Sequence, residues 1–269
     1  MEMIFCPLYS GSSGNALFVQ YGRTRLLIDA GKPGKTLHEA LGQIGVDPAT
    51  IDAILITHEH SDHIAGAGVM CRKHHIPIYA NQTTWDAMAG KLGNVPEDCR
   101  RTFESDGDFY LGDIGVVPFR IPHDAAEPVG YRLWGGGLSI STATDLGHFP
   151  RHVRDAVAGS SLVLLESNHD PEMLRMNAHY SPYLQQRILG NHGHLSNEAC
   201  ADALTQLVNT GVRNVILGHL SGENNRPELA LATSEERMER EGVRLGADLQ
   251  LELAWRDHIG SVYTLGEGA

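Results

Sequence analysis

Three histidines and an aspartate stand close together in the segment Thr57-His58-Glu59-His60-Ser61-Asp62-His63. Imidazole nitrogens and carboxylate oxygens are common ligands of zinc and related ions. The segment directly follows the apolar run Ile54–Ile56, which reads as a buried strand. Side chains of this kind are costly to bury without partners, and a divalent cation is the simplest partner for all of them. The spacing His-x-His-x-Asp-His therefore predicts a metal site at the end of a strand.

Beyond this segment, residues 64–73 alternate small and apolar positions and predict a helix, so the motif lies in a strand-to-helix turn. Further metal-binding side chains follow apolar runs later in the chain. The carboxyl ends of strands are where an α/β sheet presents functional groups, so we expect these residues near the motif. They are His123 after Val116–Ile121, Asp145 after Leu138–Thr144 and His219 after Val215–Gly218.

This order of motifs resembles that of the metallo-β-lactamase fold superfamily of dinuclear metallohydrolases. The resemblance implies that two metal ions share seven ligands, with His58, His60 and His123 on one ion and Asp62, His63 and His219 on the other. Asp145 would bridge the two ions, and Asp62 is counted among the catalytic residues as well. Asp29 closes the apolar run Arg25–Ile28, where it is well placed to accept the free N–H of a ligand histidine in the second shell.

Pattern alone predicts an α/β fold with helices on both outer faces of the sheets. The resemblance implies the finer arrangement, an αββα four-layer sandwich in which two mixed β-sheets face each other. No composition break and no Pro/Ser-rich linker divides the 269 residues, so we expect one domain over residues 1–269. The last expected strands, 249–255 and 261–265, should complete the second sheet.

No long apolar stretch and no basic, apolar amino terminus is present, which predicts a cytoplasmic protein that does not enter a membrane. The cysteines Cys6, Cys71, Cys99 and Cys200 lack Cys-x-x-Cys spacing and are expected to be buried small hydrophobes. The formal net charge of -12 argues against loose binding of nucleic acid, because such binding normally depends on a basic surface. Two divalent ions would nevertheless make one cleft attractive to phosphate.

Two segments between Asp145 and His219 resemble the Glu and His motifs of the phosphodiesterase branch of the superfamily, which includes transfer-RNA 3' processing nucleases. They are Leu164–Asp170, which contains Glu166, and Gly190–Asn197, which contains His194. In that branch the histidine, oriented by the glutamate, protonates the departing oxygen. The resemblance therefore implies that His194 and Glu166 are catalytic.

One subgroup matches over nearly the whole chain, and only the part after about residue 226 matches weakly. This subgroup is the bacterial YycJ (WalJ) family, regarded as metal-dependent and linked to 5' to 3' exonuclease action on DNA. The resemblance implies a dinuclear metal-dependent phosphodiester hydrolase whose substrate is single-stranded DNA or a nucleotide-like ester. It rests on Gly-Ser-Ser-Gly-Asn at 11–15, Glu-Ser-Asn-His-Asp at 166–170, Gly-His-Leu-Ser-Asn at 193–197 and Gly-His-Leu-Ser-Gly-Glu-Asn-Asn at 218–225.

A ligand set of imidazoles and carboxylates without a thiolate suits Zn²⁺, Mn²⁺ or Fe²⁺, and the sequence does not choose among them. Two such ions about 3.5–4 Å apart can share a water and lower its pKa to about 7. Several polar loop residues are candidates for binding the phosphate, although turn hydrogen bonds would explain them equally well. They are Asn15, Asn168, His169, Ser221, Asn224 and Asn225.

Other functions stay open at this point. A small-molecule phosphodiesterase acting on a nucleotide or cyclic phosphate is slightly favoured by the acidic charge. An acyl hydrolase such as a lactonase or thioesterase would leave Glu166 and His194 without a clear role. A metal-free scaffold would have lost ligands, and oxygen-reducing di-iron relatives carry a carboxylate where His60 stands. The oligomeric state, the metal and the direction of cleavage are not readable from the sequence.

Overall fold

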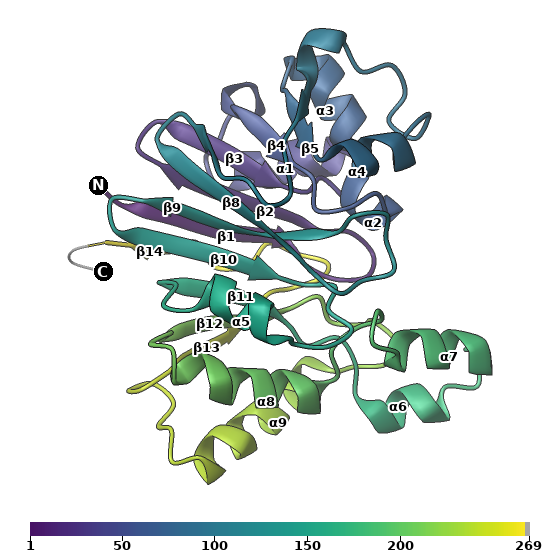
Figure 1. The fold of residues 1–269 in the computed structure, drawn as a ribbon, viewed down its shortest axis with the longest axis vertical. Coiled ribbons are helices and arrows are strands. Elements are labelled where there is room, and N and C mark those ends of the chain that lie inside the picture. The colour runs from purple at the N-terminus through teal and green to yellow at the C-terminus, as the bar shows by residue number, and fades with distance from the viewer. Residues whose placement is uncertain (267–269) are drawn as a thin grey trace.

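The computed structural model describes residues 1–266, and two seven-stranded sheets form its centre (Figure 1). The first sheet holds, in spatial order, β14 (Tyr263–Leu265), β1 (Met3–Tyr9), β2 (Ala16–Tyr21), β3 (Thr24–Ile28), β4 (Ala53–Leu55), β5 (Ile78–Ala80) and β6 (Arg100–Thr102). The second holds β13 (Gln250–Leu253), β12 (Asn214–Gly218), β11 (Leu162–Glu166), β10 (Leu138–Ala143), β9 (Val129–Gly135), β8 (Ile114–Arg120) and β7 (Phe109–Leu111).

Both sheets are mixed in the same way. In the first, strands β14 to β3 are antiparallel and β3 to β6 are parallel. In the second, β7 to β10 are antiparallel and β10 to β13 are parallel. Parallel neighbours must be joined by crossovers, which are helical here, and this brings several strand ends to one edge of each sheet.

Helices cover the outer faces of the sheets (Figure 1). The first sheet is covered by α1 (Gly34–Gln43), α3 (Ala67–His74) and α4 (Gln82–Ala87), and the second by α5 (Arg151–Val157), α8 (Asn197–Val208) and α9 (Pro227–Arg240). The remaining helices are α2 (Ser61–Ile64), α6 (Pro171–Met176) and α7 (Pro182–Leu189), with 3₁₀ turns at Pro48–Thr50 and Glu97–Cys99.

Three apolar clusters explain this layering. Side chains from both sheets, among them Phe5 and Tyr131, form a central cluster between the sheets. Leu41 of α1 belongs to a cluster beneath the first helical layer, and Leu204 of α8 belongs to one beneath the second. Strands buried on both faces must be apolar throughout, and β11 is buried along its whole length. The predicted αββα sandwich is confirmed.

Two expectations about individual elements are wrong. The helix expected over residues 64–73 is divided into α2 and α3, because Gly66 lies where the loop before α1 passes and donates its N–H to the carbonyl of Ala30 at 2.7 Å. The segment near 261–265 does not complete the second sheet, since β14 pairs with β1 at the edge of the first. Strand β13 does complete the second sheet, as expected.

Helices α6 and α7 project from the body of the molecule as an arm (Figure 1). Residues 171–189, here called the α6–α7 arm, were not expected as helices from the sequence. The helix α7 is short, and its apolar pair Leu184 and Ile188 is only partly buried, so the signal for an amphipathic helix is weak. All four cysteines are buried and free, as expected. Among residues 1–266, no helix combines the length and apolar character needed to cross a bilayer.

Candidate metal centre and active-site pocket

Tight loops at strand ends hold the acidic and imidazole side chains in place. Asp29 follows β3, Asp145 follows β10 and His219 follows β12, and all three have left-handed backbones with φ of 59°, 60° and 57°. Residues with a side chain rarely adopt this region, and such outliers gather at functional sites where the surrounding structure enforces them. Backbone strain at three convergent strand ends therefore marks this edge as the site.

The His-x-His-x-Asp-His loop is held against the loop after β3 by backbone contacts. The N–H of Asn15 donates to the carbonyl of Asp62 at 2.8 Å, and the N–H of Gly31 donates to the carbonyl of Asn15 at 2.7 Å. A Cβ at Gly31 would lie 1.6 Å from the carbonyl oxygen of Asp62. Only glycine permits this approach, so Gly31 positions the motif.

His58, His60 and His123 form the first cluster of potential ligands. His60 Nδ1 lies 3.1 Å from His58 Nε2 and 3.3 Å from His123 Nε2. Nitrogens that bind one tetrahedral zinc ion at ~2.1 Å each lie ~3.4 Å apart. The three nitrogens thus have the spacing of ligands to a single ion.

Asp62, His63 and His219 form the second cluster. Asp62 Oδ2 lies 3.6 Å from His63 Nε2 and 3.9 Å from His219 Nε2. Asp145 stands between the clusters: its carboxylate is 3.5 Å from His63 Nε2, 3.5 Å from His219 Nε2 and 3.8 Å from His123 Nε2. All seven residues predicted as ligands therefore converge on one place.

The outer nitrogens of three of these imidazoles face hydrogen-bond acceptors. His63 Nδ1 is 2.7 Å from Asp29, His219 Nδ1 is 2.8 Å from Glu166, and His123 Nδ1 is 3.2 Å from the carbonyl of Gly193. Each contact keeps the proton on Nδ1, so the lone pair of Nε2 points to the centre. Asp29 lies beside His63, the position expected from the sequence.

The centre fits divalent cations. Asp145 Oδ2 and His219 Nε2 are buried and have no hydrogen-bond partner. Buried polar atoms without partners cost free energy, and lone pairs that face one another repel. A cation bound between these atoms would give each of them a partner and remove the repulsion. The donors are nitrogens and oxygens without a thiolate, which suits Zn²⁺, Mn²⁺ and Fe²⁺ alike.

Burial and charge shift the pKa values in the centre. Burial alone lowers the pKa of His63, but Asp29 and Asp145 outweigh it and raise that pKa to about 9. Burial and the neighbouring imidazoles both hold the pKa of His58 well below its usual range. Burial raises the pKa of Asp62, but His219 and His63 more than reverse this and hold it well below its usual range. In the metal-free protein a proton therefore occupies His63, and a metal ion must displace it to bind there.

Glu166 joins the centre to His194. Its side chain is fully buried, and Oε1 accepts from His194 Nδ1 and from His219 Nδ1, both at 2.8 Å. Oε2 accepts the backbone N–H of Leu146 at 2.6 Å and that of Leu195 at 3.2 Å. With Nδ1 held by the carboxylate, the Nε2 edge of His194 is free for a ligand. This is the pairing that the sequence predicted for the two residues.

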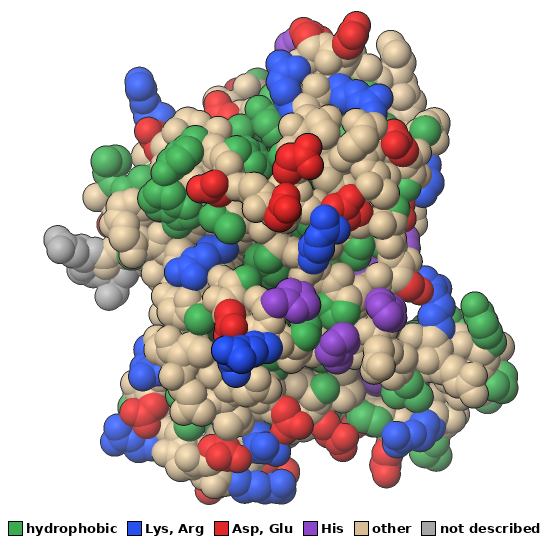
Figure 2. Space-filling model, viewed as in Figure 1, with side chains coloured by type: hydrophobic (Ala, Val, Ile, Leu, Met, Phe, Trp, Pro, Cys, Tyr) green, Lys and Arg blue, Asp and Glu red, His purple; other side chains and the backbone are tan. Residues whose placement is uncertain are grey.

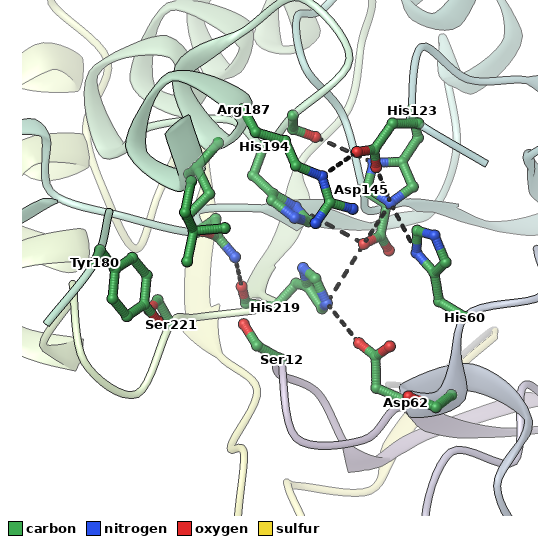
Figure 3. A pocket seen from close by; sticks show the side chains of 16 residues that line it. Ser12, His60, Asp62, His123, Asp145, Tyr180, Arg187, His194, His219 and Ser221 are labelled. Carbon is green, nitrogen blue, oxygen red and sulfur yellow. Dashed lines mark hydrogen bonds and ion pairs between the residues drawn. The ribbon is translucent and has the colours of Figure 1, made fainter. Parts of the chain in front are cut away.

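A cleft of about 320 Å³ opens over the two clusters (Figure 3). Among the described residues, Arg187 is the only lysine or arginine that lines it. It forms an ion pair with Asp124, the neighbour of His123. The lining consists of Ser12, His60, Ser61, Asp62, His123, Asp124, Asp145, Asn168, Tyr180, Leu184, Arg187, Ile188, Gly193, His194, His219 and Ser221. Histidine side chains also gather near the middle of the face shown in Figure 2, while acidic and basic groups are scattered over it.

The α6–α7 arm supplies the wall residues that sequence reasoning missed, chiefly Tyr180 and Arg187. A signal for the helix was present: Ser181 is its N-cap and accepts from the N–H of Leu184, and Pro182 occupies the first helical position. Ser-Pro before a run without Gly or Pro predicts a helix start. Nothing in the sequence indicated that this helix would cover the metal centre.

The predicted phosphate contacts divide into two groups. Asn168 and Ser221 line the cleft, although Asn168 Nδ2 also donates to the carbonyl of His219 at 2.8 Å. The others are not part of the cleft lining, and hydrogen bonds within the protein account for most of them. Asn15 bonds to Gly11, Asn224 accepts from Asn177, Asn225 donates to Ser167 and Asn168, and His169 is 1% exposed with both ring nitrogens unpaired.

Comparison with known proteins agrees with this geometry. A family profile described as "Beta-lactamase superfamily domain" matches residues 24–220. The chain is 38% identical to exodeoxyribonuclease YycJ of Bacillus anthracis over 93% of this chain and 95% of that protein. It is 40% identical to exodeoxyribonuclease WalJ of Streptococcus pneumoniae over 91% of each.

The fold also matches solved structures. The metallo-β-lactamase fold protein YhfI of Bacillus subtilis superimposes with a TM-score of 0.73 over 98% of this chain and 100% of that one, at 15% identity. Identity at this level supports the fold alone, whereas the sequence relatives also support the resemblance drawn from the motifs. The chain therefore belongs to the β-lactamase superfamily of metallohydrolases and, within it, to the group that contains the YycJ and WalJ exodeoxyribonucleases.

Proposed function

We propose that this chain is a dinuclear metal-dependent exodeoxyribonuclease that hydrolyses phosphodiester bonds of DNA, in the 5' to 3' direction that its family resemblance implies. One observation carries the proposal: a buried glutamate, Glu166, holds both a histidine of the metal cluster and His194 at the cleft. A phosphodiester needs a proton for its leaving oxygen, and His194 is the group that supplies it. The names of the relatives, both exodeoxyribonucleases, agree with this substrate.

Two divalent ions belong to the proposed enzyme. His58, His60 and His123 would hold one, Asp62, His63 and His219 would hold the other, and Asp145 would contact both. When bound, the ions supply a water of lowered pKa and neutralise charge on the phosphate oxygens.

The protein side chains then have separate tasks. Glu166 accepts the Nδ1 proton of His194, and the proton that His194 gives to the leaving oxygen is a second one, carried on Nε2 at the opposite edge. Arg187 brings the only fixed cation of the cleft wall to the phosphate, and Asp124 orients it. Asn168 and Ser221 offer neutral hydrogen-bonding groups on the same wall.

A small-molecule phosphodiesterase is the second candidate, since the net charge of -12 repels a long polyanion. An acyl hydrolase is a weaker one, because it gives the Glu166–His194 pair no task. These classes differ in substrate length and bond type. Turnover of 5'-phosphorylated single-stranded DNA, of a p-nitrophenyl ester of thymidine monophosphate and of an activated thioester separates them.

The experiment uses the purified protein, Asp145→Ala and a control, Asp155→Ala, whose carboxylate is half exposed on α5. We expect Asp145→Ala to lose metal and phosphodiester hydrolysis together, because it removes the group between both clusters. Metal content is measured by elemental analysis and turnover on the substrates above. Hydrolysis that Asp145→Ala retains at the level of Asp155→Ala would refute the assignment, and faster turnover of the thioester than of DNA would refute the proposed substrate.

A further inference from the structure

A second cavity of about 360 Å³ adjoins the metal-centre cleft, and Ser221 lines both. Two short segments build it, the loop before α9 and the chain after β13. It is here called the Trp255 cavity. Its lining includes Ser221, Arg226, Glu228, Trp255, Arg256, Asp257 and His258. Among the described residues that line this cavity, Ser221 alone has a part in the proposed chemistry.

A pair of stacked rings forms one side of the Trp255 cavity. The centroids of Trp255 and His258 are 4.8 Å apart and their planes differ by 25°. Trp255 is 36% exposed although tryptophan is normally well buried, and the chain has only three tryptophans. A rigid, exposed aromatic surface is what a nucleobase requires for stacking, and base stacking tolerates any sequence.

Two glycines make room for Arg256, Gly222 for its guanidinium and Gly11 for its stem. A Cβ at Gly222 would lie 1.4 Å from a terminal nitrogen of Arg256, and one at Gly11 would lie 2.7 Å from its Cγ. Arg256 therefore lies between the loop after β1 and the loop after β12, beside Ser221 and the cleft. It is also close enough to Lys32 to add to the effect of burial in lowering the pKa of that amine.

The net charge of the cavity lining also differs from that of the whole chain. Arg226 and Arg256 are balanced by Glu228 and Asp257, so the lining is formally neutral on a chain of net charge -12. A strand of DNA meets less repulsion here than over the average surface, and the two arginines are available to its phosphates. Stacking then supplies most of the attraction.

We propose that the Trp255 cavity binds the single-stranded DNA that continues from the scissile phosphate, with one base stacked on Trp255 and His258 and its phosphates on Arg256 and Arg226. The inference rests on the proposed function, since it extends the same substrate beyond the metal centre. The shared wall residue Ser221 makes the two sites continuous, so one strand can occupy both.

The test compares Trp255→Ala with Trp134→Ala. Trp134 is a matched control: it is 37% exposed, lies on β9 and lines neither cavity. Dissociation constants are measured by fluorescence anisotropy on the metal-loaded protein with labelled phosphorothioate oligonucleotides of about 4–16 nucleotides, which resist hydrolysis, and again with metals removed. Trp255→Phe keeps a ring at the same position and tests whether stacking is the cause.

Loss of one stacked base should weaken binding by roughly 5- to 150-fold in Trp255→Ala. Trp134→Ala should bind like the wild type, and Trp255→Phe should recover most of the loss. With metal restored, Trp255→Ala should raise KM for oligonucleotides and leave turnover of the thymidine p-nitrophenyl ester unchanged, because that ester does not reach the cavity.

Equal dissociation constants for Trp255→Ala and Trp134→Ala would overturn the inference and leave the nuclease proposal standing. The reverse outcome is also distinguishable. If Trp255→Ala alone weakens oligonucleotide binding but the metal-loaded wild type hydrolyses neither DNA nor the ester, the binding surface stands and the proposed function fails.

Discussion

Replacing Glu166 by glutamine tests how the centre controls its protons. The two backbone N–H groups of Leu146 and Leu195 point at Oε2, so the amide oxygen of a glutamine must take that place. Its NH₂ group then faces Nδ1 of both His194 and His219, where the carboxylate Oε1 accepts now. A donor in this position forces both imidazoles to accept at Nδ1 and carry their proton on Nε2.

The size of the effect follows from the two tautomers. His219 would present a proton where it now presents a lone pair to the metal centre, and loss of such an outer contact lowers metal affinity by about 10- to 100-fold. His194 would keep a proton on Nε2 but lose the carboxylate that offsets the charge of its doubly protonated ring, so it would be a much weaker proton donor. General acid catalysis contributes about 10²- to 10⁴-fold. At saturating metal, kcat for DNA should therefore fall by about 10²- to 10⁴-fold, or ~3–5 kcal/mol in activation free energy.

The assay compares two leaving groups in Glu166→Gln. An oligonucleotide departs as an alkoxide and needs a proton, whereas p-nitrophenolate departs without one. We expect a large loss of turnover on DNA and a much smaller one on the thymidine p-nitrophenyl ester. Glu198→Gln serves as the control, because Glu198 is exposed in the first turn of α8. Elemental analysis shows whether the metals are retained.

Two results would contradict this reasoning. Equal losses on both substrates, with full metal content, would mean that Glu166 supports the centre without controlling the proton of His194. Unchanged metal affinity and unchanged turnover would mean that the proton positions inferred from the hydrogen bonds are wrong.

Two further predictions concern protons and packing. Asp29 and Asp145 outweigh burial and raise the pKa of His63 to about 9, so below pH 9 a proton occupies the metal-free site. Zinc affinity should thus rise from pH 7 to 9, by up to about tenfold per pH unit for each displaced proton, in titrations against a coloured chelator; a constant affinity would refute this. Gly31→Ala should lower the free energy of unfolding by about 1–3 kcal/mol and reduce metal content, because the new Cβ meets the carbonyl of Asp62. Gly42→Ala in α1, where a Cβ meets nothing within 4 Å, should be neutral or stabilising, so equal thermal shifts in the two variants would argue against the packing explanation.

The convergence of the proposed ligands was predictable because their signals are local. His58 to His63 are adjacent in sequence, and Asp145 and His219 each follow an apolar run that can only be a buried strand. Asp29 was predictable for the same reason, and its carboxylate does lie beside His63. The assignment of one domain over residues 1–269 stays a prediction.

Other features leave little trace in a sequence. A strand as short as β14 carries too few residues to reveal its partner, so its pairing with β1 was missed. The left-handed backbones at Asp145 and His219 depend on contacts from distant segments, and neither residue is a glycine that would signal them. Arg187 lies on a helix without a buried face, and only the three-dimensional arrangement brings it to the cleft.

The pairing of β14 with β1 also bears on how the protein is made. Met3 to Phe5 expose the outer edge of β1 until residues 263–265 have left the ribosome and reached it. An unpaired strand edge invites association with other chains, so the growing polypeptide carries this hazard while the residues between the two strands are made. His219 is likewise made long after His58, so the proposed metal centre is complete only when both segments have been made and have folded together.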